Sequence, residues 1–218
     1  MMYYNFIIIA LLSYLIGSFS TAFVFNRAFN KIDPRETGSK NLGALNTLRI
    51  TSKKSGKVAG IIAFLIVFLV DAFKGAFCVW FAMQIMPANI VLASVVASFF
   101  VVLGHNYSIL LKFDGGRGAA TFLGILLFLK WQIFVIWLLY ILLCMFLFEV
   151  VSPVSEFGDF YKRAISDQII GRIFGEIVVL IPLFFLNIQI FWIALAVTPL
   201  IVIRHIDRIK EQIKTCKK

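Results

Sequence analysis

Residues 3–25 contain no charged side chain, and four further apolar runs follow at 58–83, 90–111, 119–148 and 173–203. A membrane-spanning helix needs about 20 mostly apolar residues, so each run is long enough to cross a bilayer. Hydrophobic residues make up 61% of the 218 residues, against roughly 45–50% in soluble domains. A soluble globule could not bury so much apolar surface. The sequence therefore predicts an all-α polytopic membrane protein and excludes a soluble enzyme, a disordered chain and a secreted disulfide scaffold.

Basic residues gather between the apolar runs. The segment 27–57 holds eight Lys and Arg residues against two acidic residues. Cytoplasmic loops are enriched in Lys and Arg, so we expect this segment inside and the N-terminus outside. No basic residue precedes the first run, which argues against a cleavable signal peptide. The net charge of +10 is therefore interpreted mainly as membrane orientation, and no nucleic-acid partner is expected.

The number of spans depends on the two longest runs. Residues 119–148 and 173–203 are each intermediate between the about 20 residues of one span and the about 40 of two. Five spans result if each run is one tilted helix, and seven if each is a pair of short helices broken near 130–131 and 187–189. We prefer seven, because the polar segment 149–172 then faces the cytoplasm with the other basic segments. Both alternatives place the C-terminus in the cytoplasm.

The first basic segment combines glycine, small polar side chains and arginine at Gly38, Ser39, Asn41, Gly43, Asn46 and Arg49. Glycine allows tight turns and close approach to a ligand, and the Ser and Asn side chains supply neutral hydrogen-bonding groups. Arginine binds phosphate through two parallel hydrogen bonds. The alternative is that the asparagines cap or turn the chain with no ligand.

A second polar segment has three glycines around one arginine, at Gly115, Gly116, Arg117 and Gly118, where a new helix is expected to begin. Main-chain N–H groups and the dipole of a helix N-terminus favour an anion. The G-x-x-x-x-G-K-[ST] pattern of a Walker A loop is absent. The segment therefore predicts a phosphate site, and a flexible loop between short helices is the alternative.

Asp71 and Lys74 lie inside the second apolar run. A spacing of three places both side chains on one face of a helix. Charges in a membrane span are costly unless they pair or face the bundle interior. The two residues are expected either to form an ion pair that orients helices or to contact a ligand directly.

Two later segments give weaker signals. Ser152 and Ser155 could present their hydroxyls together, but no His–Asp pattern activates either as a nucleophile. Arg204 and His205 follow the last apolar run, where basic residues are often only topology signals, although His205 could bind phosphate or move a proton. The three cysteines and two histidines form no metal-binding spacing, so no metal and no cofactor is expected.

Taken together, these motifs resemble the bacterial acyl-phosphate-dependent glycerol-3-phosphate acyltransferases of the PlsY type. The resemblance covers most of the chain, and the glycine-rich segment is its most specific part. The matching residues are Gly17, Ser18, Gly38, Ser39, Asn41, Gly43, Ala44, Asn46, Arg49, Asp71, Lys74, Gly75, Gly104, His105, Asn106, Phe113, Gly115, Gly116, Arg117, Gly118, Ala120, Thr121, Val151, Ser152, Ser155, Arg204 and His205.

This resemblance implies seven spans, an active site at the cytoplasmic face of the cell membrane, and acyl transfer from acyl phosphate to the sn-1 hydroxyl of glycerol 3-phosphate. It also implies that no covalent acyl-enzyme forms and that substrate phosphate helps to deprotonate the attacking hydroxyl. The catalytic residues carried over are Ser39, Asn46, Arg49, Arg117 and His205. The substrate-binding residues are Gly38, Asn41, Gly43, Asp71, Lys74, His105, Asn106, Gly115, Gly116, Gly118, Thr121, Ser152, Ser155 and Arg204.

Several positions depart from the family's usual pattern. Arg117 stands where Lys is usual, which keeps the charge but changes its geometry. Asp114 stands where Lys is usual and puts a negative charge beside the predicted phosphate site. Other departures are Leu45, Glu149, Arg208 and extra polar residues within 156–172. A relative with another acyl donor or acceptor is therefore an alternative.

A membrane transporter for a phosphorylated solute is the alternative from another functional class. Intramembrane charges and broken short helices are typical of transporters, but the sequence lacks a convincing internal repeat. We expect a single membrane domain over residues 1–218 that contacts membrane lipids, acts on acyl phosphate and glycerol 3-phosphate, and is monomeric.

Overall fold

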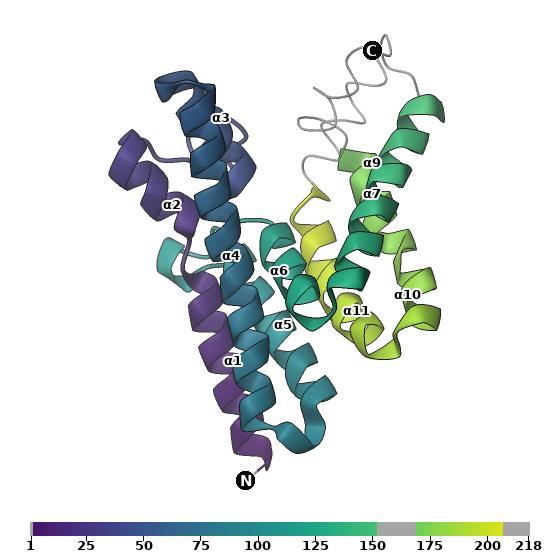
Figure 1. Ribbon diagram of the computed structural model, residues 1–218. Helices are drawn as coiled ribbons and strands as arrows, with labels where there is room; N and C mark the ends of the chain where they lie inside the picture. Colours follow the sequence, from purple (N-terminus) through teal and green to yellow (C-terminus); the bar gives the residue numbers. More distant parts are fainter. Residues whose placement is uncertain (1, 152–168, 207–218) are drawn as a thin grey trace. The chain divides into compact units, whose positions relative to one another are not determined.

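The computed structural model describes residues 2–151 and 169–206 of the chain, and its regular elements there are helices (Figure 1). One isolated antiparallel bridge joins Ser108 to Asp114. The helices group into two compact units, residues 1–129 and 130–218, and each is described by itself. The expected all-α class is confirmed.

Unit 1 is built around α1, α4 and α5, which run side by side (Figure 1). The helix α3 packs against α4 and the short π-helix η1, and α6 packs against α4 and α5. The elements of the unit are α1 (Met2–Ser18), α2 (Thr21–Phe25), η1 (Asn26–Asn30), α3 (Ala44–Ser55), α4 (Lys57–Ile85), η2 (Pro87–Asn89), α5 (Ile90–Asn106), η3 (Ile109–Leu111) and α6 (Ala119–Leu129).

Unit 2 contains the remaining described helices. The helix α7 packs against α9, and α9 also contacts α10 and α11. Their bounds are α7 (Trp131–Val151), α9 (Ile169–Val178), α10 (Leu180–Leu186) and α11 (Ile188–Ile203).

The two longest apolar runs are broken where the sequence predicts. A break at Lys130 separates α6 from α7, and a break at Asn187 separates α10 from α11. The Asn187 side chain caps α11 by accepting a hydrogen bond from the Ile190 N–H at 3.0 Å. Within the described residues, four segments are long and apolar enough to cross a membrane: Tyr3–Asn30, Lys57–Ile85, Pro87–Asn106 and Trp131–Phe148. The choice between five and seven spans stays a prediction, because α6 and α11 are shorter than these segments.

The first apolar run differs from the single helix that its sequence predicts. The helix α1 ends at Ser18 and α2 begins at Thr21, so a break falls at residues 19–20. The Ser20 hydroxyl caps α2 by accepting from the Phe23 N–H at 3.3 Å. The small and polar residues Gly17, Ser18, Ser20 and Thr21 mark this break in the sequence. The length and hydropathy of the whole run hide it.

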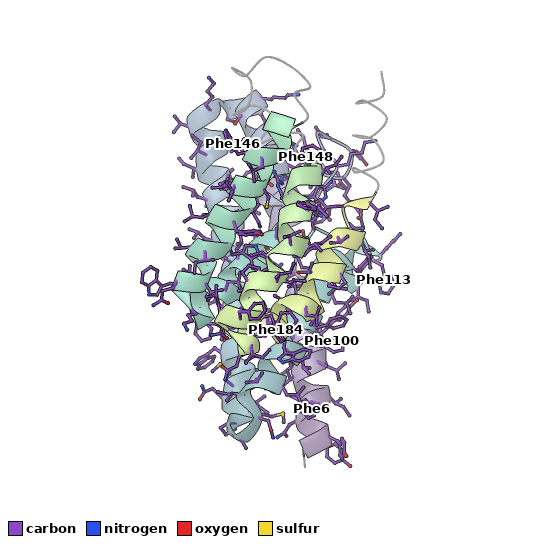
Figure 2. All side chains as sticks on the ribbon, turned by 90° about the vertical axis from the view of Figure 1, so that its right-hand side faces the viewer. Phe6, Phe100, Phe113, Phe146, Phe148 and Phe184 are labelled. Carbon is purple, nitrogen blue, oxygen red and sulfur yellow. The ribbon has the colours of Figure 1, made fainter. Side chains whose placement is uncertain are left out.

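Large apolar side chains cover the outside of the helices, whereas many polar side chains lie inside. Phe113, Phe146 and Phe184 are exposed (Figure 2), and the exposed fraction of Phe185 reaches 80%. Asp71 and Lys74, by contrast, are buried. This arrangement reverses the pattern of soluble proteins and is the one expected of a protein that lies in lipid. The chain is a helical membrane protein.

Glycines allow the helices of unit 1 to approach closely. A Cβ at Gly17 would overlap the main chain of Val101 on α5, and a Cβ at Gly104 would overlap the Tyr14 carbonyl on α1. Gly75 on α4 and Gly124 on α6 make the same kind of approach between those two helices. Small residues are the usual means of close helix packing in membranes, where lipid removes the hydrophobic drive between helices.

Substitution of Gly17 tests this packing. Gly17→Ala should destabilise the protein by about 1–3 kcal/mol, because the added methyl group overlaps the main chain of α5. The measurement is the thermal unfolding temperature in detergent. Leu11→Ala changes an exposed side chain on the same helix and should leave that temperature nearly unchanged. Equal stability of Gly17→Ala and wild type would contradict the close approach of α1 and α5.

Candidate functional site

The glycine-rich loop, residues 115–118, connects the polar segment after α5 to the start of α6. The Gly116 N–H donates to the His105 carbonyl at 2.9 Å, and the Gly115 N–H donates to Asp114 Oδ1 at 2.9 Å. Gly118 has a φ of +80°, a conformation that side chains disfavour. These contacts tie the loop to the C-terminal turn of α5, so it is packed against the protein rather than open.

Close packing explains two of the loop's glycines. A Cβ at Gly115 would lie 2.5 Å from the Asn106 carbonyl oxygen, and a Cβ at Gly116 would lie 2.8 Å from two carbon atoms of the His105 ring. Both glycines are buried. A side chain at either position would push the loop away from α5, and with it the start of α6.

The loop leads into the first turn of α6, whose N-terminal N–H groups make a favourable place for an anion. Arg117 is half-buried at this point. Thr121 is fully buried, and its Oγ1 has no hydrogen-bond partner among the described residues. The structure thus brings the predicted residues Arg117, Gly118 and Thr121 to one helix N-terminus.

Asn46 organises the first polar segment from inside. Its amide nitrogen donates to the carbonyls of Pro34 (2.9 Å) and Thr37 (3.1 Å), and its Oδ1 accepts from the Ser39 N–H at 2.9 Å. Gly38 has a φ of +66° and packs directly on Asn46. The predicted residues Gly38, Ser39 and Asn46 therefore lie together, and the Asn46 amide is engaged in holding the turn.

The other predicted residues of this segment lie at the start of α3. Gly43 precedes the first residue of the helix, and the Asn41 side chain lies beside Gly43. Arg49 follows Asn46 by three positions, which places both side chains on the same side of α3. Arg49 is half-buried.

Sequence reasoning missed a ladder of buried side chains that holds α3 against η1. Asn26 Nδ2 donates to Thr47 Oγ1 at 2.8 Å, and Asn30 Nδ2 donates to Thr51 Oγ1 at 2.8 Å. The two rungs are joined by a 2.9 Å hydrogen bond from Asn30 to Asn26 Oδ1. The available signal was the spacing of four between the two asparagines and between the two threonines. This spacing puts the asparagines on one helical face and the threonines on another.

Asp33 is a buried carboxylate between two arginines. It lies 3.0 Å from Arg27 and 2.7 Å from Arg35. The hydrogen bond from Arg35 is the main cause that lowers the pKa of Asp33 to about 2, against burial, which acts in the opposite direction. The same hydrogen bond raises the pKa of Arg35, and the negative charges of Asp114 and Glu36 add to that shift. Asp114, a departure from the family pattern, therefore acts electrostatically on Arg35 of the first polar segment.

Asp71, Lys74 and His105 form a buried cluster between α4 and α5. Lys74 Nζ lies 2.9 Å from Asp71 Oδ1 and 2.8 Å from His105 Nδ1. Thr21 Oγ1 donates to Asp71 Oδ1 at 3.0 Å. The spacing of three did predict the Asp71–Lys74 pair, and the structure adds Thr21 and His105 as its neighbours.

The remaining predicted residues belong to unit 2 or lie outside the described residues. His205 is buried, with its Nδ1 2.7 Å from the Ile201 carbonyl, and Arg204 is half-buried at the end of α11. Ser152 and Ser155 lie outside the described residues. Within residues 2–151 and 169–206, no group of three or more His, Cys, Asp or Glu side chains is arranged to hold a metal ion.

Comparison with known proteins decides the family. The family model described as glycerol-3-phosphate acyltransferase matches residues 7–215, nearly the whole chain. The chain belongs to the glycerol-3-phosphate acyltransferase family. The expected resemblance to the PlsY type is thereby confirmed.

Individual relatives match over part of their length. A glycerol-3-phosphate acyltransferase of Burkholderia ambifaria is 42% identical over 118 residues, which are 54% of this chain and 51% of that protein. One from Ruthia magnifica is 43% identical over 126 residues, or 58% of this chain and 59% of that protein. The chain thus spans about half the length of the curated relatives it matches.

A solved structure shares the fold. The crystal structure of PlsY, an integral membrane glycerol 3-phosphate acyltransferase, in its glycerol 3-phosphate form, matches with a TM-score of 0.72 and 22% identity. The match covers 97% of this chain and 93% of that one. The lysophosphatidic acid form matches with a TM-score of 0.68. The helical arrangement of this family member is therefore that of PlsY.

Asn46→Asp tests how this family member holds its first polar segment. The substitution replaces an amide that donates to two carbonyls by a carboxylate oxygen that repels them, so we expect a loss of about 1–3 kcal/mol for each unsatisfied group. The measurement is thermal stability in detergent. Asn89→Asp makes the same change at an exposed position and should have little effect. A variant as stable as wild type would mean that Asn46 does not hold the turn.

The ion pairs of Asp33 with Arg27 and Arg35 predict that the stability of the protein falls at acid pH. The folded-state pKa of Asp33 is lowered, so its contribution to stability is fully present above the ordinary value of 3.8 and is lost as the pH falls toward about 2. The unfolding temperature of the wild type should drop over this range more than that of Asp33→Asn. Glu36→Gln, at an exposed neighbour, should retain the wild-type pH profile. Identical profiles for wild type and Asp33→Asn would contradict the assignment.

Proposed function

We propose that the protein transfers an acyl chain from acyl phosphate to the sn-1 hydroxyl of glycerol 3-phosphate, giving lysophosphatidic acid and inorganic phosphate. Membership of the glycerol-3-phosphate acyltransferase family supports the acceptor and the reaction class. The acyl-phosphate donor and the sn-1 position are what the resemblance of the sequence motifs to the PlsY type implies.

The observation that carries this proposal is the packed glycine-rich loop at the N-terminus of α6. The N–H groups of the first turn of α6 and the half-buried Arg117 supply donors and positive charge to an anion, and the packed loop sets where that turn begins. Both proposed substrates carry phosphate, so a site of this chemistry suits them. An acyl chain is apolar and can remain in the lipid beside the exposed apolar side chains of the helices.

As the resemblance of the motifs implies, we assign binding of the glycerol phosphate to Arg49 and Arg117, since arginine binds phosphate with two parallel hydrogen bonds. The resemblance gives the same role to His205 of unit 2, which can donate a hydrogen bond. The glycine-rich loop and the small polar side chains line the acyl-phosphate site in this proposal: Ser39, Asn41, Asn46, Ser152 and Ser155. The substrate-binding set also includes Gly38, Gly43, Asn106, Thr121 and Arg204.

The reaction joins the glycerol oxygen to the acyl carbon and breaks the bond from that carbon to the phosphate oxygen. The hydroxyl proton passes to substrate phosphate, and the acyl group never becomes attached to the protein. The contribution of the protein is to hold two phosphate-bearing reactants in register, which lowers the entropic part of the barrier. We further propose seven spans, a site facing the cytoplasm, a location in the cell membrane, and a monomer.

Transport of a phosphorylated solute is less well supported. The features that suggested it were intramembrane charges and broken helices. In the structure Asp71 and Lys74 are buried and bonded to each other and to neighbouring groups of unit 1. Family membership points to an acyltransferase.

Arg117 gives the sharpest test of the proposed site. Purified protein with acyl phosphate and glycerol 3-phosphate should release lysophosphatidic acid and phosphate. Arg117→Ala should lower kcat/KM by about tenfold to a hundredfold, the effect of losing hydrogen bonds to a charged group. Arg117→Lys keeps the charge and restores the residue usual in the family, so it should retain most of the activity.

Two outcomes would contradict the proposed function. Folded wild-type protein that makes no lysophosphatidic acid from acyl phosphate would exclude this donor, and the same assay with acyl-CoA or acyl carrier protein thioester identifies another one. Counterflow of glycerol 3-phosphate in liposomes without any acyl donor would favour a transporter.

A further inference from the structure

A continuous set of buried contacts joins the end of α1 to the glycine-rich loop through one lysine and one histidine. We propose that Lys74 and His105 are positioning residues, which hold the glycine-rich loop in place for the reaction rather than contacting substrate. The inference rests on the proposed function for the identity of the substrates. It departs from the sequence expectation that these two residues bind substrate directly.

Lys74 is surrounded by acceptors. Its Nζ lies 3.3 Å from the Gly17 carbonyl and 3.0 Å from the Phe19 carbonyl, in addition to its contacts with Asp71 Oδ1 and His105 Nδ1. The ammonium has three hydrogens and no acceptor, so it donates to all four of these groups and two of them share one hydrogen. The side chain is 7% exposed. The positive charge of Lys74 is therefore compensated by the carboxylate and the acceptors of unit 1.

This arrangement fixes the state of the His105 ring. Because the Lys74 ammonium donates, His105 Nδ1 accepts, and a neutral imidazole that accepts at Nδ1 carries its hydrogen on Nε2. The Nε2 end of the ring lies against Gly116. The lysine thus sets both the orientation of the ring and which nitrogen faces the loop.

The loop meets His105 at two places. The His105 carbonyl accepts from the Gly116 N–H, and the His105 ring fills the space that a Cβ of residue 116 would need. A ring free to rotate could move aside for such a Cβ. Lys74 holds the other edge of this ring at 2.8 Å, so the ring cannot yield without giving up a buried hydrogen bond to a charge. The place of Gly116 is therefore set by His105, and that of His105 by Lys74.

The same cluster holds the break in α1. Lys74 satisfies carbonyls at the end of that helix, and Ser108 Oγ donates to the Ser18 carbonyl at 2.6 Å. Tyr14 OH donates to the Tyr107 carbonyl at 2.8 Å. Two independent links therefore tie the end of α1 to the segment that leads into the glycine-rich loop. A shift of about 1 Å in a reactive group can cost about a hundredfold in rate, so loop position matters for catalysis.

A double-mutant cycle between residues 105 and 116 tests the contact. Gly116→Ala alone should lower kcat/KM for acyl phosphate by about tenfold or more, because its methyl group meets a ring that cannot move. His105→Asn removes the Nε2 end of the ring but keeps an acceptor for Lys74 at the position of Nδ1. In that background Gly116→Ala should cost only about threefold or less. An equal cost of Gly116→Ala in both backgrounds would overturn the proposal.

Hydrogen exchange of the substrate-free protein gives a readout that does not depend on activity. Lys74→Met should speed exchange in peptides that cover residues 113–120 by about tenfold or more, because the loop loses its support, and should leave α3 peptides unchanged. Lys54→Met is the matched control, since Lys54 also donates to a carbonyl, that of Asn30, at 2.6 Å, but in another part of unit 1. It should leave the loop peptides at the wild-type rate.

The two measurements separate this proposal from the proposed function. Wild-type exchange in the loop of Lys74→Met, or faster exchange spread over all of unit 1, would overturn the positioning role. If the loop of Lys74→Met alone exchanges faster but wild-type protein makes no lysophosphatidic acid, the proposed reaction fails and the support of the loop by Lys74 stands. If Lys74→Met does not fold, the cycle between residues 105 and 116 still decides.

Discussion

The carbonyl groups at the end of α1 pose the main physical problem of unit 1. A helix that ends inside an apolar run leaves main-chain acceptors that hydrocarbon cannot satisfy. Lys74 and Ser108 supply donors to these carbonyls from α4 and from the segment after α5. The break in the helix is possible because two segments distant in sequence donate hydrogen bonds to its carbonyls. The same hydrogen bonds then fix where those segments lie, and so connect a backbone requirement to the geometry of the glycine-rich loop.

Glycines next to the polar groups let the helices approach closely enough for these hydrogen bonds to form. Gly17 precedes Ser18, Gly75 follows Lys74, and Gly104 precedes His105. At each position the glycine contacts the main chain of a neighbouring helix, while the adjacent residue takes part in the hydrogen bonds around the break or in the buried cluster. A larger residue at any of these glycines would separate the helices. The hydrogen bonds of the cluster would then lengthen and lose much of their strength.

The sequence predicted features that depend on local pattern and missed those that depend on distant residues. The breaks at Lys130 and Asn187 were predictable because a polar residue interrupts an apolar run, and the Asp71–Lys74 pair followed from helical spacing. The break after α1 has a local signal in Ser18, Ser20 and Thr21, but the donor to its carbonyls was not predictable, because Lys74 lies 55 residues away from Phe19. The glycine-rich motif was recognisable, but its support by His105 is a tertiary contact that no spacing reveals.

The role of Asp114 in the structure differs from the one that its position in the sequence suggests. In the sequence it places a negative charge beside a predicted phosphate site, where the family usually has Lys. In the structure its Oδ1 accepts from the Gly115 N–H, and its charge helps to raise the pKa of Arg35. The carboxylate therefore holds the turn that begins the glycine-rich loop and acts on an arginine of the first polar segment. Because part of its charge is compensated by Arg35, its repulsion of a bound phosphate is weaker than its position in the sequence implies. The acidic neighbour is therefore compatible with the phosphate-binding role that we propose for Arg117.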